Sequence, residues 1–66
     1  MTEADRIEAI DHIVSSTKYW SSENMKYDYV LEKNEAFYEA VTHVKRYHYP
    51  SLTEDDIAEA KRRLKL

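Results

Sequence analysis

The chain contains no glycine, and this absence constrains its fold more than any other feature of the sequence. Turns that need a positive φ usually place glycine there, because the Cβ atom of any other residue is crowded in that conformation. Short β-hairpin loops also favour glycine or a comparable turn former. A helical fold is therefore expected, and 66 residues make one domain, residues 1–66.

The small size of the chain limits how its fold can be stabilised. A domain of this length buries only about 60% of its unfolded surface, and such domains usually need disulfides, a metal or a partner subunit. The absence of cysteine excludes disulfides and cysteine-ligated zinc. Good helix packing or self-association remains, and we expect a homodimer.

The start of the sequence and its hydropathy indicate a soluble protein. Residues 1–5 lack the basic start and apolar run of a signal peptide. No apolar stretch approaches the roughly 20 residues of a membrane span. We therefore expect a cytoplasmic protein that makes no membrane contact.

Two segments carry clear helix signals, near residues 2–16 and 54–65. Thr2 with Asp5, and Thr53 with Asp56, have the spacing of capping boxes. In the last segment acids open the helix and bases close it, as the helix dipole favours.

The middle of the chain is predicted to form a helix near 25/35–48, with a start near residue 25 or near residue 35. Its apolar positions recur at helical spacing, and Pro50 ends it near His48. Asn34 interrupts this stripe. It is either a polar insertion in a helix that begins near 25 or the cap of a helix that begins at Glu35. Residues 17–31 form either part of these helices, with Ser22 or Asn24 as a cap, or a short β-hairpin favoured by their rings and by period-two alternation.

The expected fold class is thus all-α, a small three-helix domain. Its core is predicted from the helical stripes, and Trp20 is expected at the edge of that core. The predicted core residues are Ile7, Ile10, Val14, Val30, Phe37, Val41, Val44, Ile57 and Leu64.

The sequence lacks a recognisable set of catalytic residues. Its serines lie in hydroxyl runs or turns, and no glycine is available for a nucleophile elbow or a phosphate-binding loop. Glu39 and His43 share a helix face, but a zinc site needs three or four converging ligands. A surface hydrogen bond between them is the simpler interpretation, although His12 could approach through the fold. We predict no enzyme activity, cofactor, metal or small-molecule substrate.

The rings of the chain favour a protein partner. Six tyrosines, the tryptophan and the phenylalanine lie between residues 19 and 49, more than a small core can hold. Tyr and Trp are enriched in interface cores and hot spots. We predict a non-enzymatic interaction module, either an adaptor or a stoichiometric inhibitor of a larger protein. The predicted partner-binding residues are Tyr19, Trp20, Tyr27, Tyr29, Tyr47 and Tyr49.

Nucleic-acid binding is the alternative hypothesis. Bases and rings alternate around residue 46, and mixtures of this kind stack on single-stranded bases. The acidic start of the last helix and the net charge of −3 oppose this interpretation. The basic residues that would contact nucleic acid are Lys45, Arg46, Lys61, Arg62, Arg63 and Lys65, together with the ring of Tyr47.

Overall fold

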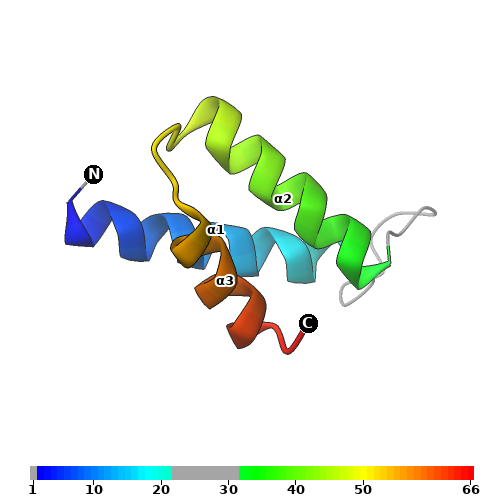
Figure 1. The fold of residues 1–66 in the computed structure, drawn as a ribbon. Coiled ribbons are helices and arrows are strands. Elements are labelled where there is room, and N and C mark those ends of the chain that lie inside the picture. The colour runs from blue at the N-terminus through cyan, green and yellow to red at the C-terminus, as the bar shows by residue number, and fades with distance from the viewer. Residues whose placement is uncertain (1, 22–31) are drawn as a thin grey trace.

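The computed structural model describes residues 2–21 and 32–66, and within these ranges the chain forms three helices and no strand (Figure 1). α1 spans Glu3–Trp20, α2 spans Lys33–Tyr47 and α3 spans Glu54–Arg63. The predicted all-α three-helix fold is confirmed. None of the described helices combines the length and the apolar character needed to cross a membrane.

α1 continues one turn beyond its predicted end. Residues 17–20 are helical and do not form the first strand of the β-hairpin that was the alternative prediction. The hydroxyl of Thr17 is buried and donates to the carbonyl oxygen of Ile13 at 2.8 Å, which satisfies the hydroxyl inside the helix. Residues 22–31, which include Tyr27, Tyr29 and Val30, lie outside the described residues.

α2 begins at Lys33, between the two predicted starts. The backbone of Glu32 is extended, with φ −66° and ψ 154°, so no single helix runs from residue 25 to residue 48. Asn34 lies exposed in the first turn and is neither a cap nor part of the buried seam. The helix ends at Tyr47, as the proline signal predicts.

The ends of α1 and α3 have the predicted local chemistry. Thr2 and Asp5 form one capping box, and Thr53 and Asp56 form the other. Each threonine hydroxyl accepts from the backbone N–H three residues later, and each aspartate accepts from the backbone N–H of the threonine. These reciprocal bonds fix where both helices begin.

α3 ends in a Schellman motif built without glycine. The N–H of Leu66 donates to the carbonyl oxygen of Lys61 at 3.1 Å, and the N–H of Lys65 donates to that of Arg62 at 3.1 Å. Lys65 has φ 59°, in the left-handed region that glycine normally occupies. The lack of glycine therefore does not prevent this turn, but it places a lysine in an unfavourable conformation.

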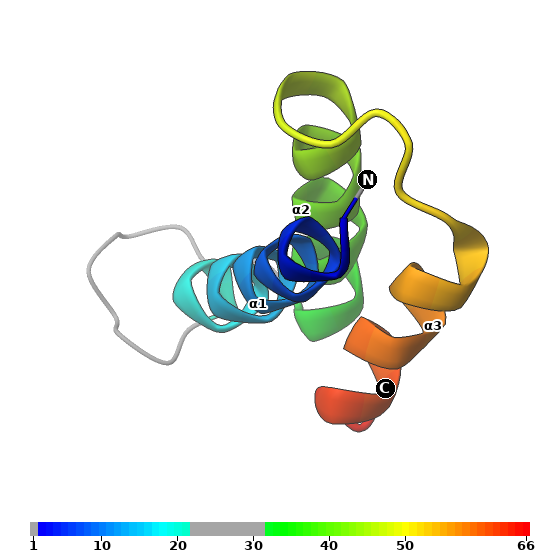
Figure 2. The same cartoon turned by 90° about the vertical axis from the view of Figure 1, so that its left-hand side faces the viewer.

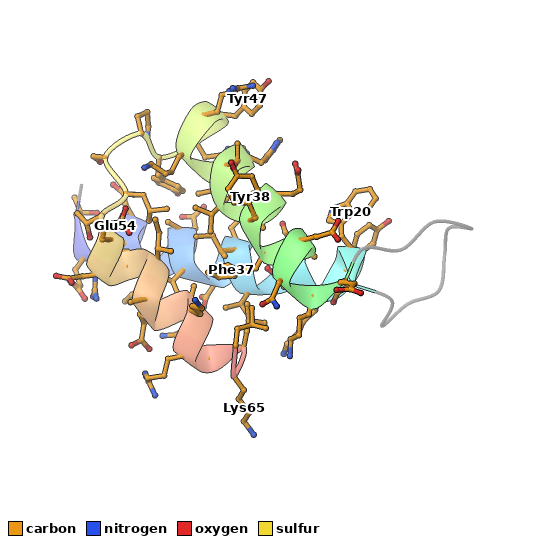
Figure 3. The ribbon with its side chains drawn as sticks, turned by 45° about the vertical axis from the view of Figure 1, so that its right-hand side comes forward. Trp20, Phe37, Tyr38, Tyr47, Glu54 and Lys65 are labelled. Atoms are coloured by element: carbon orange, nitrogen blue, oxygen red, sulfur yellow. The ribbon has the colours of Figure 1, made fainter. Side chains whose placement is uncertain are left out.

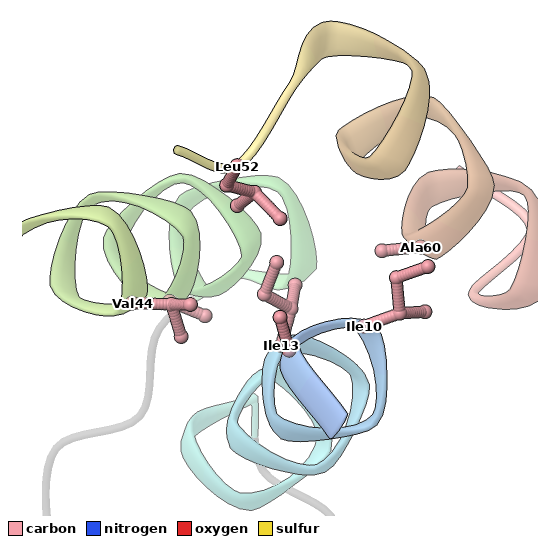
Figure 4. Packing of buried hydrophobic residues seen from close by; sticks show 7 residues of the cluster. Ile10, Ile13, Val44, Leu52 and Ala60 are labelled. Carbon is pink, nitrogen blue, oxygen red and sulfur yellow. The ribbon is translucent and has the colours of Figure 1, made fainter. Parts of the chain in front are cut away.

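Both α2 and α3 pack on α1 (Figure 2). Figure 4 shows apolar side chains from the three helices and from the loop before α3 meeting around α1. The buried cluster contains Ala9, Ile10, Ile13, Ala40, Val44, Leu52 and Ala60.

The core differs from the predicted one because the helices meet along small residues. Buried positions of α2 recur every four residues at Ala36, Ala40 and Val44, and those of α1 include Ala9 and Ile13. Alanine lets helix backbones approach closely, so these positions form the seam, and the larger side chains pack beside it.

The outcome for each predicted core residue follows from this shift. Ile10, Val44 and Leu64 are fully buried, as predicted. Val14, Phe37, Val41 and Ile57 are half-buried and pack against the cluster. The prediction that Ile7 belongs to the core is wrong. Its side chain is 46% exposed, because α1 buries the face that carries Ala9 and Ile13.

Candidate functional site

The aromatic side chains lie outside the fully buried core. Of the six Phe, Trp and Tyr residues that the structure describes, none is buried. Trp20, Tyr38 and Tyr47 are 44%, 69% and 65% exposed. The core is instead built from isoleucine, valine, leucine and alanine; Phe37 and Tyr49 pack against it, and Trp20, Tyr38 and Tyr47 remain exposed.

One pair of predicted partner-binding rings lies at the C-terminal end of α1. Tyr19 and Trp20 form an edge-to-face pair with ring centroids 5.1 Å apart and planes inclined by 82°. Such pairs are favourable beyond the area they bury. Trp20 is therefore held against a neighbouring ring while much of its surface stays in water.

The other two rings of the predicted site that the structure describes, Tyr47 and Tyr49, lie at the C-terminal end of α2 and just after it. Tyr47 is exposed and contacts His43, with centroids 4.9 Å apart. Tyr49 is half-buried and packs against the core, and burial raises the pKa of its hydroxyl, helped by the negative charge of Glu8 and a hydrogen bond with it. Tyr49 thus anchors the loop after α2 and offers little contact surface.

The structure does not bring the four described partner-binding residues, Tyr19, Trp20, Tyr47 and Tyr49, into one patch, while Tyr27 and Tyr29 lie outside the described residues. α2 starts beside the C-terminal end of α1 and ends over its N-terminal half (Figure 1). Figure 3 shows Trp20 and Tyr47 carried at opposite ends of this helix pair. Within residues 2–21 and 32–66 the predicted rings therefore form two separate groups, one at each end of the pair.

Tyr38 is an exposed ring that the predicted site omitted. It lies nine residues before Tyr47 on α2, which places the two side chains on nearly opposite sides of the helix. Its position off the apolar stripe was the signal that it would be exposed.

The three histidines of the chain form a cluster between α1 and α2. The ring centroids of His12 and His48 are 4.9 Å apart, those of His43 and His48 are 5.3 Å apart, and those of His12 and His43 are 6.4 Å apart. We call His12, His43 and His48 the histidine cluster. The spacing in the sequence pairs His43 with Glu39 and leaves open an approach of His12 through the fold. Spacing along one helix does not show which side chains meet across two, so the part of His48 was missed.

The surroundings of His12 change its pKa. Its pKa is lowered, first by burial and then by the nearby His48 and His43, against the opposing negative charge of Glu8. Across residues 2–21 and 32–66, no three or more His, Cys, Asp or Glu side chains are arranged to hold a metal ion.

The basic residues of the alternative hypothesis form two separate groups. Lys45 and Arg46 lie at the end of α2 and the others at the end of α3, and these ends lie apart in both Figure 1 and Figure 2. Arg62 pairs with Glu59 at 2.6 Å, and Arg63 with Asp11 at 3.0 Å. Two charges of the second group are therefore partly neutralised.

A shallow polar pocket of about 430 Å³ lies between the N-terminal ends of α1 and α3. Within it the guanidinium of Arg6 donates to the buried carboxylate of Asp56. Burial works to raise the pKa of Asp56, but the hydrogen bonds from Arg6 and Thr53 outweigh it and lower the pKa. The pocket residues are Thr2, Glu3, Arg6, Ser51, Thr53, Asp55 and Asp56.

No protein-family model matches the sequence, and comparison with curated proteins and with solved structures also finds no match.

Proposed function

We propose that this protein is a small non-enzymatic interaction module that binds another protein through exposed aromatic side chains. The observation that carries the proposal is that every described Phe, Trp and Tyr ring stays outside the buried core, which is built from smaller aliphatic side chains.

The energetics of aromatic burial support this proposal. A Tyr or Trp side chain buries about 150–250 Å² when it is covered, and small domains are short of buried apolar area. A module that leaves Trp20 44% exposed and Tyr47 65% exposed has apolar surface for a partner to cover. Trp and Tyr are also the residues that most often dominate binding energy.

The partner is either a larger protein, which would make this chain an adaptor or a stoichiometric inhibitor, or a second copy. Self-association would enlarge the small apolar core in the same way that a different partner would. Nucleic-acid binding is less well supported, because the basic residues are divided between two ends and partly paired.

Ring substitutions test the proposal and locate the contact. Trp20→Ala and Tyr47→Ala probe the two ends, Tyr38→Ala probes the opposite side of α2, and Ile7→Ala is the control, because it removes an exposed aliphatic side chain. Sedimentation equilibrium measures self-association, and pulldown with quantitative mass spectrometry measures capture of a partner. We expect one ring variant to weaken association at least about tenfold and the control to leave it unchanged.

Two results would contradict the proposal. One is a chain that stays monomeric at high micromolar concentration and captures the same proteins when all three rings are alanine. The other is tight binding to single-stranded DNA or RNA in mobility-shift assays, with a steep dependence on salt, which favours the nucleic-acid hypothesis instead.

A further inference from the structure

We propose that the histidine cluster is a proton-sensitive contact between two helices: protonation of His12 beside His43 and His48 loosens the packing of α2 on α1. This inference concerns the chain alone and does not depend on the proposed function.

The geometry that carries the proposal joins the two helices directly. His12 belongs to α1, His43 to the last turns of α2, and His48 is the residue that caps the end of α2. Their ring centroids lie 4.9–6.4 Å apart. Neutral imidazoles pack at these separations without penalty, but imidazolium ions repel one another because they carry like charges.

The cluster lies at the edge of the apolar seam that holds α2. His12 precedes the buried Ile13, and His43 precedes the buried Val44. Repulsion between the rings is relieved when α2 moves away from α1, and that movement would open the seam. Protonation is therefore coupled to the helix packing itself.

The charges around the cluster partly oppose this effect. On α1, Glu8 lies one turn before His12 and favours its charged form. On α2, Glu39 precedes His43 by one turn and Arg46 follows it by three residues.

The remaining neighbours do not reverse the lowering of the His12 pKa. Tyr49, in the loop after α2, hydrogen-bonds Glu8, and α3 meets α1 elsewhere, through the pairs of Arg6 with Asp56 and Arg63 with Asp11. At His12, burial and the other two histidines outweigh Glu8.

The direction of the pH effect follows from His12. Because its pKa is lower in the folded chain than the ordinary 6.5, the unfolded chain takes up this proton at higher pH. The contribution of neutral His12 to the stability of the fold is fully present above pH 6.5. It is lost as the pH falls from 6.5 through the pKa of His12 in the folded chain. Carboxylates of ordinary pKa titrate mainly below about pH 5, so the two effects occupy separate windows.

Urea unfolding at pH values between 7.5 and 5.5 tests the proposal. The buffer contains a chelator, so that metal ions do not influence the result. We expect the unfolding equilibrium constant of the wild type to rise at least about threefold over this range. His12→Gln should remove most of this rise, whatever its effect on stability at pH 7.5. Equal pH slopes in the two proteins would overturn the proposal.

Two further measurements keep the test decisive if His12→Gln does not fold. Glu8→Gln removes the charge that opposes the effect, so its pH slope should be steeper than that of the wild type; an unchanged or shallower slope counts against the proposal. In NMR titrations, His43→Gln combined with His48→Gln should raise the midpoint of His12. A midpoint that stays in place would show that the three rings are not coupled.

Discussion

α2 and α3 both pack on α1, but different interactions hold them there. The α1–α2 contact is a seam of small and aliphatic side chains, and Glu32 at the start of α2 makes no side-chain capping bond. The α3 contact combines buried Ala60 and Leu64 with a reciprocal cap and an ion pair from Arg6 to the buried Asp56.

This difference shows that one small domain can attach its helices in two ways. α2 is positioned by tertiary burial, because its own ends give few local signals. α3 is short, with 10 residues, and short helices are marginal by themselves. Its capping box, its C-terminal turn and the pair with Arg6 supply what its length does not.

The largest expected effect is at the α1–α2 seam. Ile13→Ala removes a fully buried side chain and should destabilise the fold by about 2–5 kcal/mol. A domain of this size is expected to have a stability of about 3–10 kcal/mol, so urea or thermal unfolding monitored by circular dichroism should show a large loss.

Ile7→Ala is the matched control, because it makes the same chemical change on the same helix at a position that is 46% exposed. Its effect should stay below about 1 kcal/mol. Similar losses in the two variants would mean that α1 presents a different face to α2.

The next effect is at the attachment of α3. Asp56→Asn removes a buried carboxylate that accepts from Arg6 and closes the capping box, and should cost about 2–3 kcal/mol. Asp55→Asn is the control on the same turn, exposed and limited to a helix-dipole effect of about 0.3–1 kcal/mol. Equal losses would show that the pair with Arg6 contributes little.

The pH dependence of Asp56 separates the two attachments further. Its pKa is lower in the folded chain than the ordinary 3.8, so its contribution is present above pH 3.8 and is lost as the pH falls below that value. Acid unfolding in this window should be weaker in Asp56→Asn than in the wild type.

The smallest effect is at the end of α3 and is stabilising. Lys65 occupies a left-handed conformation that costs a residue with a Cβ atom about 1 kcal/mol relative to glycine. Lys65→Gly should therefore raise the unfolding midpoint. Lys65→Ala keeps the Cβ atom and should not, so a gain in both variants would point to charge and not to backbone conformation.

Local signals in the sequence predicted a helix boundary well where two side chains cap the same helix end reciprocally. Both threonine–aspartate capping boxes are confirmed, and so is the end of α2 before Pro50. The start of α2 and the end of α1 were predicted less well. Their boundaries depend on contacts such as the buried Thr17, which periodicity alone does not show.

The candidate site was less predictable than the fold. Only the number of rings in the sequence indicated that they exceed what the core can hold, and their division between two ends became visible only in three dimensions. The meeting of His12 with His43 and His48 joins residues more than 30 positions apart in sequence.

The sequence by itself determined the helical class and the positions of the two threonine–aspartate capping boxes, because these depend on chemistry within a few neighbouring residues. Only the tertiary structure decided which face of each helix is buried and which side chains of different helices meet. Alanines that the sequence pattern does not place in the core form the seam between α1 and α2. Close approach of two backbones favours small side chains over the large apolar ones that define a stripe.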